Sequence, residues 1–262
     1  MTGRTRPLGE HLKAWRQRRR MSQMDLALEA EISTRHLSFL ETGRAQPSRE
    51  MLMHLAEQLE VPLRDRNAML VAAGFAPVYP ERSLDDPELA PARRALDLIL
   101  AGHEPYPALI VDRRWNLVAA NRALPLILTG VDPSLLEPPV NVLRVALHPK
   151  GLAGRTANHS EWRTHILERL RREIGQTADE GLIALMDELK TYPVPPAADV
   201  RPQDFGGVAV PFQLLTDDGV LSFFSTTTVL GTPVDITLSE LALETFLPAD
   251  AATAEALRKA LA

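Results

Sequence analysis

Cysteine is absent from the 262 residues of this chain, which excludes disulfide bonds, thiolate metal sites and cysteine nucleophiles. No apolar run is long enough to span a bilayer, and the basic N-terminus lacks the apolar core of a signal peptide. Aromatic residues make up only 5% of the chain, whereas hydrophobic residues make up 45% and charged residues 24%. This composition is typical of a globular protein, and we expect a cytoplasmic location with no membrane contact.

Motifs for catalysis and for bound cofactors are also missing. The sequence has no Gly-x-Ser-x-Gly pattern, no phosphate-binding loop and no dinucleotide-binding glycine pattern. Seven histidines are present, but none forms a His-x-x-x-His pair, and His159 and His165 fall on different faces of a helix. We therefore expect no metal, no cofactor, no catalytic residue and no enzymatic activity.

Charge is distributed unevenly along the chain, although its net value is only -5. Residues 1–75 contain 12 Lys and Arg against 9 Asp and Glu, a net charge of +3. The remaining residues contain 17 against 25, a net charge of -8. A cationic N-terminal part on an acidic body is the asymmetry expected of a DNA-binding protein that must avoid indiscriminate contacts.

The stretch 22–44 has the pattern of two short helices joined by a tight turn. Ser22 is a good N-cap, with Asp25 three residues later, and Ser33 caps a second apolar-periodic segment. Gly43 lies just past the end of that segment, where helices favour glycine. Helices joined by so short a turn cross steeply in a helix-turn-helix, and the second helix is then presented to the DNA major groove.

The polar outward face of the second helix supplies the candidate DNA contacts. A helical hairpin that only packs is the alternative, but the caps, turn, apolar stripe and polar face all agree with DNA binding. Basic residues at the end of the first helix add phosphate contacts unless they form a solvated face. We expect base contacts from Thr34, Arg35 and Ser38 with Phe39 beside them, and phosphate contacts from Gln23, Ser33, Arg44, Arg18 and Arg19.

The chain is long enough for two domains. We expect a DNA-binding domain over 1–75, a linker with a connecting helix over 76–106, and a second domain over 107–262. In the second domain, the patterns predict a hairpin of strands at 108–112 and 115–119, a short helix capped by Asn121, and further helices up to 190. Strands at 208–216 and 219–230, a strand over 234–237, an undecided segment at 238–247 and a closing helix follow.

Two strands, then helices, then about three antiparallel strands resemble a PAS-like sensor domain. The predicted fold class is therefore α+β: an all-α five-helix helix-turn-helix domain followed by a PAS-like α+β domain with an antiparallel sheet.

Residues 8–75 resemble the five-helix DNA-binding domain of the phage-repressor type, the XRE family. The string 33–44 resembles a bacterial subfamily whose second half is an MmyB/MltR-like ligand-binding domain. One departure is Glu31, where many relatives have glycine, and a left-handed residue other than glycine costs about 1 kcal/mol. The motifs that carry the two resemblances are Ser22-Gln23, Leu26-Ala27, 33–44, Pro47-Ser48, 107–116, 120–122, 141–149 and 221–226.

The resemblance implies an apolar, fatty-acid-like effector between the sheet and the helices. Strands rich in Leu, Val and Ile suit a flexible aliphatic ligand better than a planar one. The alternative for each candidate is that it simply fills a core. His148 could meet a polar head group, and the alternative there is a satisfied, partly exposed histidine. The candidate ligand-binding residues are Trp115, Leu117, Leu126, Leu143, Leu147, His148, Phe212 and Phe223, with Val229 beside them.

These observations predict a one-component transcription regulator that binds a double-stranded DNA operator as a homodimer and senses a small apolar effector such as a fatty acid or a lactone. In one alternative, the C-terminal domain serves only dimerisation, and a tightly filled core would favour it. In a second alternative, the chain is an enzyme with a DNA-binding appendage, which would need a buried pair of polar residues with shifted pKa values in a cleft.

Overall fold

The computed structural model describes residues 6–196, 209–231 and 233–261. The chain divides into two compact units. One comprises Met1–Arg82 together with Pro233–Ser239, and the other comprises Ser83–Thr232 together with Glu240–Ala262. Each unit has its own hydrophobic core, and we describe each by itself.

Five helices build the N-terminal unit, as the sequence predicts. Ser22 and Asp25 form a reciprocal capping box, in which the Ser22 hydroxyl accepts from the Asp25 N–H (3.1 Å) and the Asp25 carboxylate accepts from the Ser22 N–H (2.7 Å). The Ser33 and Ser48 hydroxyls cap the next two helices. The helices are α1 (Leu8–Arg18), α2 (Gln23–Glu29), α3 (Thr34–Glu41), α4 (Arg49–Gln58) and α5 (Leu63–Ala72).

The turn between α2 and α3 passes through a left-handed residue that is not glycine. Glu31 has φ +53°, and the next N–H, that of Ile32, donates to the carbonyl of Ala27 (2.9 Å). The predicted departure at Glu31 is thus accommodated by a left-handed glutamate. The strain of about 1 kcal/mol is small beside the apolar burial of Leu26, Leu37 and Leu40.

A buried carboxylate ties the first three helices together. Glu41 at the end of α3 has a side chain that is 2% exposed. Arg16 of α1 donates to both of its oxygens (2.6 and 3.0 Å), and the Gln23 side chain of α2 donates a third hydrogen bond (2.7 Å). Because a bidentate guanidinium has a fixed geometry, this network constrains how α1, α2 and α3 are oriented relative to one another.

A segment from the C-terminal part of the chain belongs to the N-terminal unit. Helix α11 (Ile236–Ser239) and the residues before it fold with α5 and the chain at 80–82. Asp235 is 2% exposed, pairs with Arg82 (3.2 Å) and accepts from the Thr237 N–H (2.9 Å). The strand predicted over 234–237 is wrong, because Asp235 caps a helix there.

A five-stranded antiparallel sheet forms the centre of the C-terminal unit. Its order is β2-β1-β5-β4-β3, so the α+β prediction with a PAS-like antiparallel sheet is confirmed. The undecided segment 238–247 contributes most of β5, and the strand predicted from 208 starts outside the described residues. The strands are β1 (Ala108–Val111), β2 (Leu117–Ala120), β3 (Phe212–Thr216), β4 (Gly219–Val229) and β5 (Ala242–Pro248).

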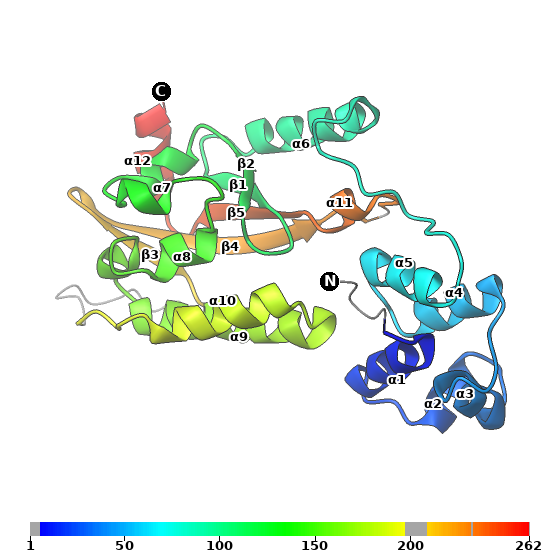
Figure 1. Cartoon of the computed structure of the whole chain (residues 1–262). Helices are drawn as coiled ribbons and strands as arrows, with labels where there is room; N and C mark the ends of the chain where they lie inside the picture. Colours follow the sequence, from blue (N-terminus) through cyan, green and yellow to red (C-terminus); the bar gives the residue numbers. More distant parts are fainter. Residues whose placement is uncertain (1–5, 197–208, 232, 262) are drawn as a thin grey trace. The chain divides into compact units, whose positions relative to one another are not determined.

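Helices cover the sheet. Figure 1 shows α9 and α10 packed side by side on one side of the strands, with α8 close to them. The C-terminal helix α12 contacts β4 and β5. The helices are α6 (Ala90–Gly102), α7 (Leu124–Leu128), α8 (Val142–Leu147), α9 (His159–Thr177), α10 (Glu180–Thr191) and α12 (Ala251–Leu261).

Two sequence predictions in this unit are wrong in detail. Trp115 does not begin a strand: it lies in the turn between β1 and β2 with φ +65°. The Asp112 carboxylate accepts from the N–H groups of Arg114 (2.8 Å) and Asn116 (2.9 Å), which stabilises this turn. Asn121 does not cap α7. The N-cap of α7 is Ala123. The Asn121 side-chain oxygen accepts from the N–H groups of Ala108 (3.1 Å) and Ala123 (3.3 Å), and so ties the end of β2 to β1.

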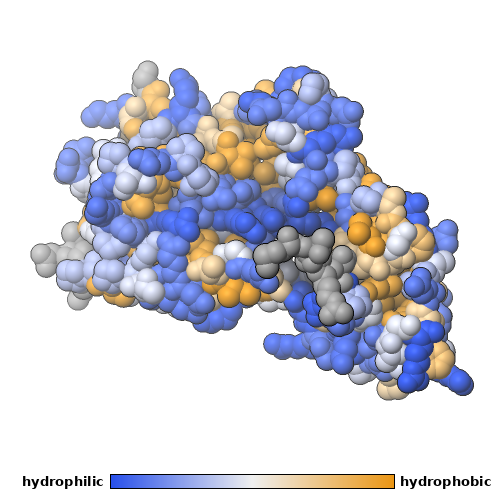
Figure 2. All heavy atoms as spheres, viewed as in Figure 1, coloured by the Kyte–Doolittle hydropathy of each residue, from blue (hydrophilic) through white to orange (hydrophobic). Residues whose placement is uncertain are grey.

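The surface is mostly hydrophilic on the face that Figure 2 shows, with smaller hydrophobic areas between. Most large apolar side chains lie in the two cores. No helix among the described residues is both long and apolar enough to cross a membrane.

Replacing Glu41 with alanine should lower the free energy of unfolding of the N-terminal unit by about 3 kcal/mol, because Arg16 is then a largely buried charge without its partner. Glu60→Ala is the control, since Glu60 is 81% exposed and lies 3.8 Å from Arg19. It should change the same quantity by less than about 1 kcal/mol. Hydrogen exchange of the α1–α3 amides in the full chain measures both effects, and equal effects would contradict a structural role for the network.

Candidate DNA-binding surface and effector cavity

The outer face of α3 is polar and accessible. Thr34 and Arg35 are exposed, and Ser38 and Phe39 are half-buried. The Ser33 hydroxyl accepts from the His36 N–H (3.1 Å). All the predicted base-reading side chains therefore lie on the first two turns of one helix, the part of a recognition helix that enters the major groove.

Phe39 brings two cations close together on this surface. The guanidinium of Arg35 lies 5.3 Å from the centre of the Phe39 ring, and that of Arg44 lies 5.9 Å from it. Both arginines are exposed. Cation–π contact orients each guanidinium on the protein surface without using its N–H donors, so both forks can still bind a base edge or a phosphate.

The remaining predicted DNA contacts also have roles inside the unit. The Gln23 side chain donates to Glu41. The Arg18 guanidinium lies 4.5 Å from the centre of the Trp15 ring. Arg19 donates to the carbonyls of Leu59 (2.9 Å) and Glu60 (2.8 Å) at the end of α4. Arg19 thus partly serves to cap a helix, whereas the Arg18 guanidinium makes no hydrogen bond within the part of the chain that the structure describes.

A cavity of about 90 Å³ lies in the C-terminal unit between the sheet and helices α7, α8 and α9. Its wall is mainly aliphatic and aromatic, with contributions from all five strands or their ends and from the turn that holds Trp115. Four of the predicted residues line it: Trp115, Leu117, Leu143 and Phe212.

The other predicted ligand-binding residues are not among those that line the cavity. Leu147 and Phe223 are fully buried in the core around it, and Leu126 packs against that core. The ring of His148 makes an edge-on contact with Tyr192, and its Nδ1 accepts from the Lys150 N–H (3.1 Å). Val229 is 65% exposed at the end of β4.

One end of the cavity is polar. Arg169 of α9 donates to both oxygens of Glu244 on β5 (3.0 and 2.6 Å). Its Nε lies 3.4 Å from a Glu173 oxygen. The side chain of Glu244 is 6% exposed, and that of Arg169 is 20% exposed. Burial acts to lower the pKa of Arg169, but the hydrogen bonds and charges of Glu244 and Glu173 outweigh it and raise the pKa.

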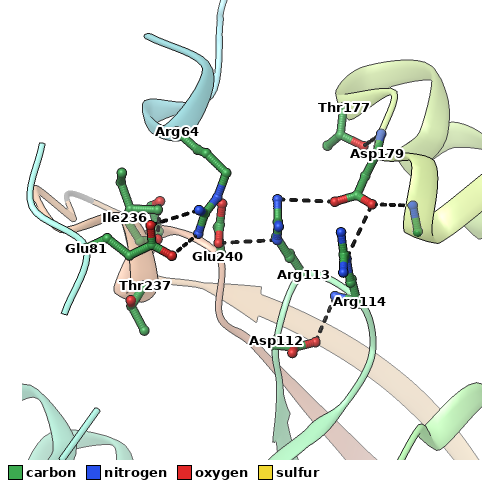
Figure 3. Close-up of polar contacts among 12 residues, drawn as sticks. Arg64, Glu81, Asp112, Arg113, Arg114, Thr177, Asp179, Ile236, Thr237 and Glu240 are labelled. Atoms are coloured by element: carbon green, nitrogen blue, oxygen red, sulfur yellow. Dashed lines mark hydrogen bonds and ion pairs between the residues drawn. The ribbon is translucent and has the colours of Figure 1, made fainter. Parts of the chain in front are cut away.

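Trp115 joins this ion-pair cluster to the cavity. Its indole N–H donates to Glu173 (2.8 Å), and the Arg169 guanidinium lies 4.4 Å from the centre of its ring. Two neighbouring arginines hold its turn in place: Arg113 (3.2 Å) and Arg114 (3.4 Å) both pair with Asp179, the N-cap of α10, as Figure 3 shows. The left-handed backbone of Trp115 is therefore stabilised by contacts of its own side chain and by the ion pairs of its two preceding residues.

The other titratable groups at this end have shifted pKa values. Burial is the main cause that lowers the pKa of His165, and the nearby charges of Arg169 and Arg172 add to it, so the imidazole is neutral at pH 7. Burial raises the pKa of Glu173 against the opposing hydrogen bonds from Trp115 and Arg169. The neutral His165 ring stacks on Trp162 at 5.4 Å.

Sequence reasoning missed the polar end entirely. Helix α9 places Trp162, Ile166, Arg169 and Glu173 at spacings of three and four, which is one face of a helix. The arginine and the glutamate on this otherwise apolar face were the signal in the sequence that could have indicated a buried polar site. Glu244 gave none, because its segment was undecided between helix and strand.

Among the described residues, no group of three or more His, Asp or Glu side chains could hold a metal ion. The ion pairs at the cavity involve a guanidinium that holds its proton, so they do not form an acid–base pair.

Comparisons with known proteins identify both parts of the chain. A helix-turn-helix domain model matches residues 7–69, and the model of the MmyB-like transcription regulator ligand binding domain matches residues 92–260. These matches do not name the XRE subfamily, so that membership stays a prediction. A search of curated proteins finds no match.

Among solved structures, the chain is similar to an RNA-binding Light-Oxygen-Voltage receptor. The two share 14% identity with a TM-score of 0.28 over 97% of this chain and 62% of the receptor chain. This chain thus spans less than two thirds of that protein, and so weak a likeness carries no argument here. The ligand-binding-domain model, by contrast, covers more than half of the chain, and the chain belongs to the family of MmyB-like transcription regulators, with a helix-turn-helix domain at its N-terminus.

Proposed function

We propose that this DNA-binding transcription regulator is a one-component sensor: a homodimer binds an operator through α3, and a small apolar effector in the C-terminal unit changes that binding. The observation that carries the proposal is the cavity of about 90 Å³ in the ligand-binding domain. A C-terminal unit that served only dimerisation would have no use for such a space, since protein cores are normally close-packed.

The lining supports an apolar effector. Ligand sites are mostly apolar and carry a few polar groups that orient the ligand, and this cavity follows that pattern with aliphatic walls and one Arg–Glu end. Fatty acids and lactones both combine an aliphatic body with one polar head. The DNA surface on α3 would read one half-site, and two copies would read half-sites about 34 Å apart.

The path of the chain supports coupling between the two functions. Ser225 of β4 and both Glu244 and Phe246 of β5 line the cavity, while residues 233–239 between these strands fold with the N-terminal unit. A ligand that displaces either strand therefore pulls on a segment of the DNA-binding unit through covalent bonds. It changes DNA affinity to the extent that it binds the two states unequally.

An apolar ligand should stabilise the C-terminal unit against heat. A hundredfold excess over Kd corresponds to about 2.7 kcal/mol, so a thermal-shift screen of medium-chain acids, amides and lactones should show a clear rise in Tm. Operator binding with and without each hit then tests regulation. If no apolar compound raises the Tm, the C-terminal unit is a dimerisation body.

Replacing Arg35 with alanine should weaken operator binding by about 1–3 kcal/mol if its fork reads a guanine edge. Arg35→Lys is the control, because lysine keeps the charge but loses the bidentate geometry. Titration of operator and random DNA at fixed salt separates the two roles. A base contact predicts that both variants lose specificity, whereas full recovery by lysine would make Arg35 a phosphate contact.

Replacing Asp235 with alanine should uncouple effector from operator. The change removes the cap of α11 and the partner of Arg82, while no residue of the cavity is altered. Effector affinity should stay the same, and the effector-induced change in DNA affinity should shrink. The control is Asp85→Ala, an ion-paired aspartate with an exposed side chain. An unchanged response in Asp235→Ala would rule out this route of coupling.

A further inference from the structure

The polar end of the cavity limits which head group an effector can carry. Three residues that line this end have polar side chains that can meet a ligand: Arg169, Glu244 and Ser225, with His165 beside them. Glu244 lies on the central strand β5, where it pairs with Leu109 of β1 and Thr227 of β4. Its carboxylate therefore sits in the middle of the sheet and faces the space under the helices.

The cation at this end is already neutralised. Arg169 donates to both Glu244 oxygens (3.0 and 2.6 Å), and its Nε lies 3.4 Å from Glu173. Two carboxylates thus surround one guanidinium. His165 adds no positive charge at pH 7, because burial and Arg169 lower its pKa. The end of the cavity has no net positive charge to offer an anion.

An ionised carboxylate would be poorly placed here. It would lose its water on entry, and the nearest charges would include the Glu244 carboxylate, which already binds both Nη atoms of Arg169. Like charges in a partly buried site repel strongly, because the effective dielectric constant is well below that of water. Proteins usually bind a carboxylate through a bidentate guanidinium. Here Arg169 already makes that interaction with Glu244.

Hydrogen bonds to a neutral head remain available. A guanidinium has five N–H donors, and the two Nη atoms of Arg169 each donate once to Glu244, so each has a second N–H. A carboxylate has about four acceptor sites, so Glu244 can also accept from a ligand. The Ser225 hydroxyl is both donor and acceptor.

We infer that the effector has an uncharged polar head, such as an amide, an alcohol or a lactone, on an aliphatic body, and that Glu244 is the residue that excludes a carboxylate. This inference rests on the proposed effector-binding function and narrows its ligand class. A space of about 90 Å³ holds roughly six to nine water-sized groups, so an eight-carbon chain is a suitable probe.

The experiment compares four eight-carbon compounds on the full chain at pH 7.5: octanamide, γ-octalactone, octanoate and octylammonium. Trp115 and Trp162 line the cavity, so quenching of tryptophan fluorescence, checked by calorimetry, reports binding. Octanamide or γ-octalactone should bind about tenfold or more tightly than octanoate, a factor that represents only about 1.4 kcal/mol of charge repulsion.

Substitution of Glu244 tests its role directly. Glu244→Gln removes one negative charge at constant shape, so octanoate affinity should rise about tenfold while octanamide affinity changes little. The matched control is Glu188→Gln. Glu188 forms the same bidentate pair with Arg144 (2.8 and 2.8 Å) in this unit but does not line the cavity. It should leave the ratio unchanged. Glu173→Gln should likewise raise the affinity for octanoate relative to octanamide, and it replaces Glu244→Gln in this test if that variant does not fold.

Each outcome has a definite meaning. Preference for the neutral probes, relaxed by Glu244→Gln and kept by Glu188→Gln, supports the inference. Octanoate or octylammonium binding the native protein as tightly as octanamide would overturn it and leave the proposed apolar sensor intact. An unchanged ratio in both Glu244→Gln and Glu173→Gln would also overturn it. No binding by any of the four probes would count against the proposed sensor itself and hence against the inference.

Discussion

The buried carboxylate of Glu244 is the constraint around which the C-terminal unit is arranged. A charge in the middle of a sheet is costly unless it is paired and hydrogen-bonded. Arg169 supplies that partner from α9 through two hydrogen bonds, which fixes the rotation of α9 about its axis over the strands. The charged pair occupies one end of the layer between sheet and helix, and the cavity lies in the same layer, lined there by Arg169 and Glu244.

The same pair orders the turn between β1 and β2. Trp115 packs its ring under the Arg169 guanidinium and donates to Glu173, and these contacts offset the strain of its left-handed backbone, of order 1–3 kcal/mol. The turn is also tied to α10 through Asp179. A bound molecule that moved Trp115 would therefore disturb a set of charge contacts and not one isolated side chain.

The N-terminal unit also holds a buried carboxylate, Glu41, with a bidentate arginine, Arg16. The helices of this unit were far easier to predict from the sequence. Its helix boundaries follow from local signals: Ser22, Ser33 and Ser48 at the caps, and Gly43 past the end of α3. Such signals act over three or four residues, so they are legible in the sequence. Glu41 was not identified as a buried ion-pair partner, because its partners Arg16 and Gln23 lie 25 and 18 residues away.

The cavity was only half predictable for the same reason. Trp115, Leu117, Leu143 and Phe212 could be proposed from apolar patterning, which says that a side chain is buried but not whether it faces a space or another side chain. Phe223 shows the difference: it is fully buried, stacks with Phe212 and makes an edge-on contact with Phe246. It lies two residues before Ser225 on the same face of β4, yet of these two residues it is Ser225 that lines the cavity.

The prediction of a strand over 234–237 from local sequence preference was wrong for a physical reason. Val234 and Ile236 favour strands, yet the local side-chain cap from Asp235 and the long-range bonds to Pro80 and Arg82 produce a short helix instead. Those partners lie about 155 residues away in sequence, so no window could contain them. The segment takes its structure from the N-terminal unit, while the strands that precede and follow it, β4 and β5, belong to the sheet of the C-terminal unit. The coupling that we propose between effector and DNA therefore runs through the backbone that joins Asp235 and its partner Arg82 to β4 and β5.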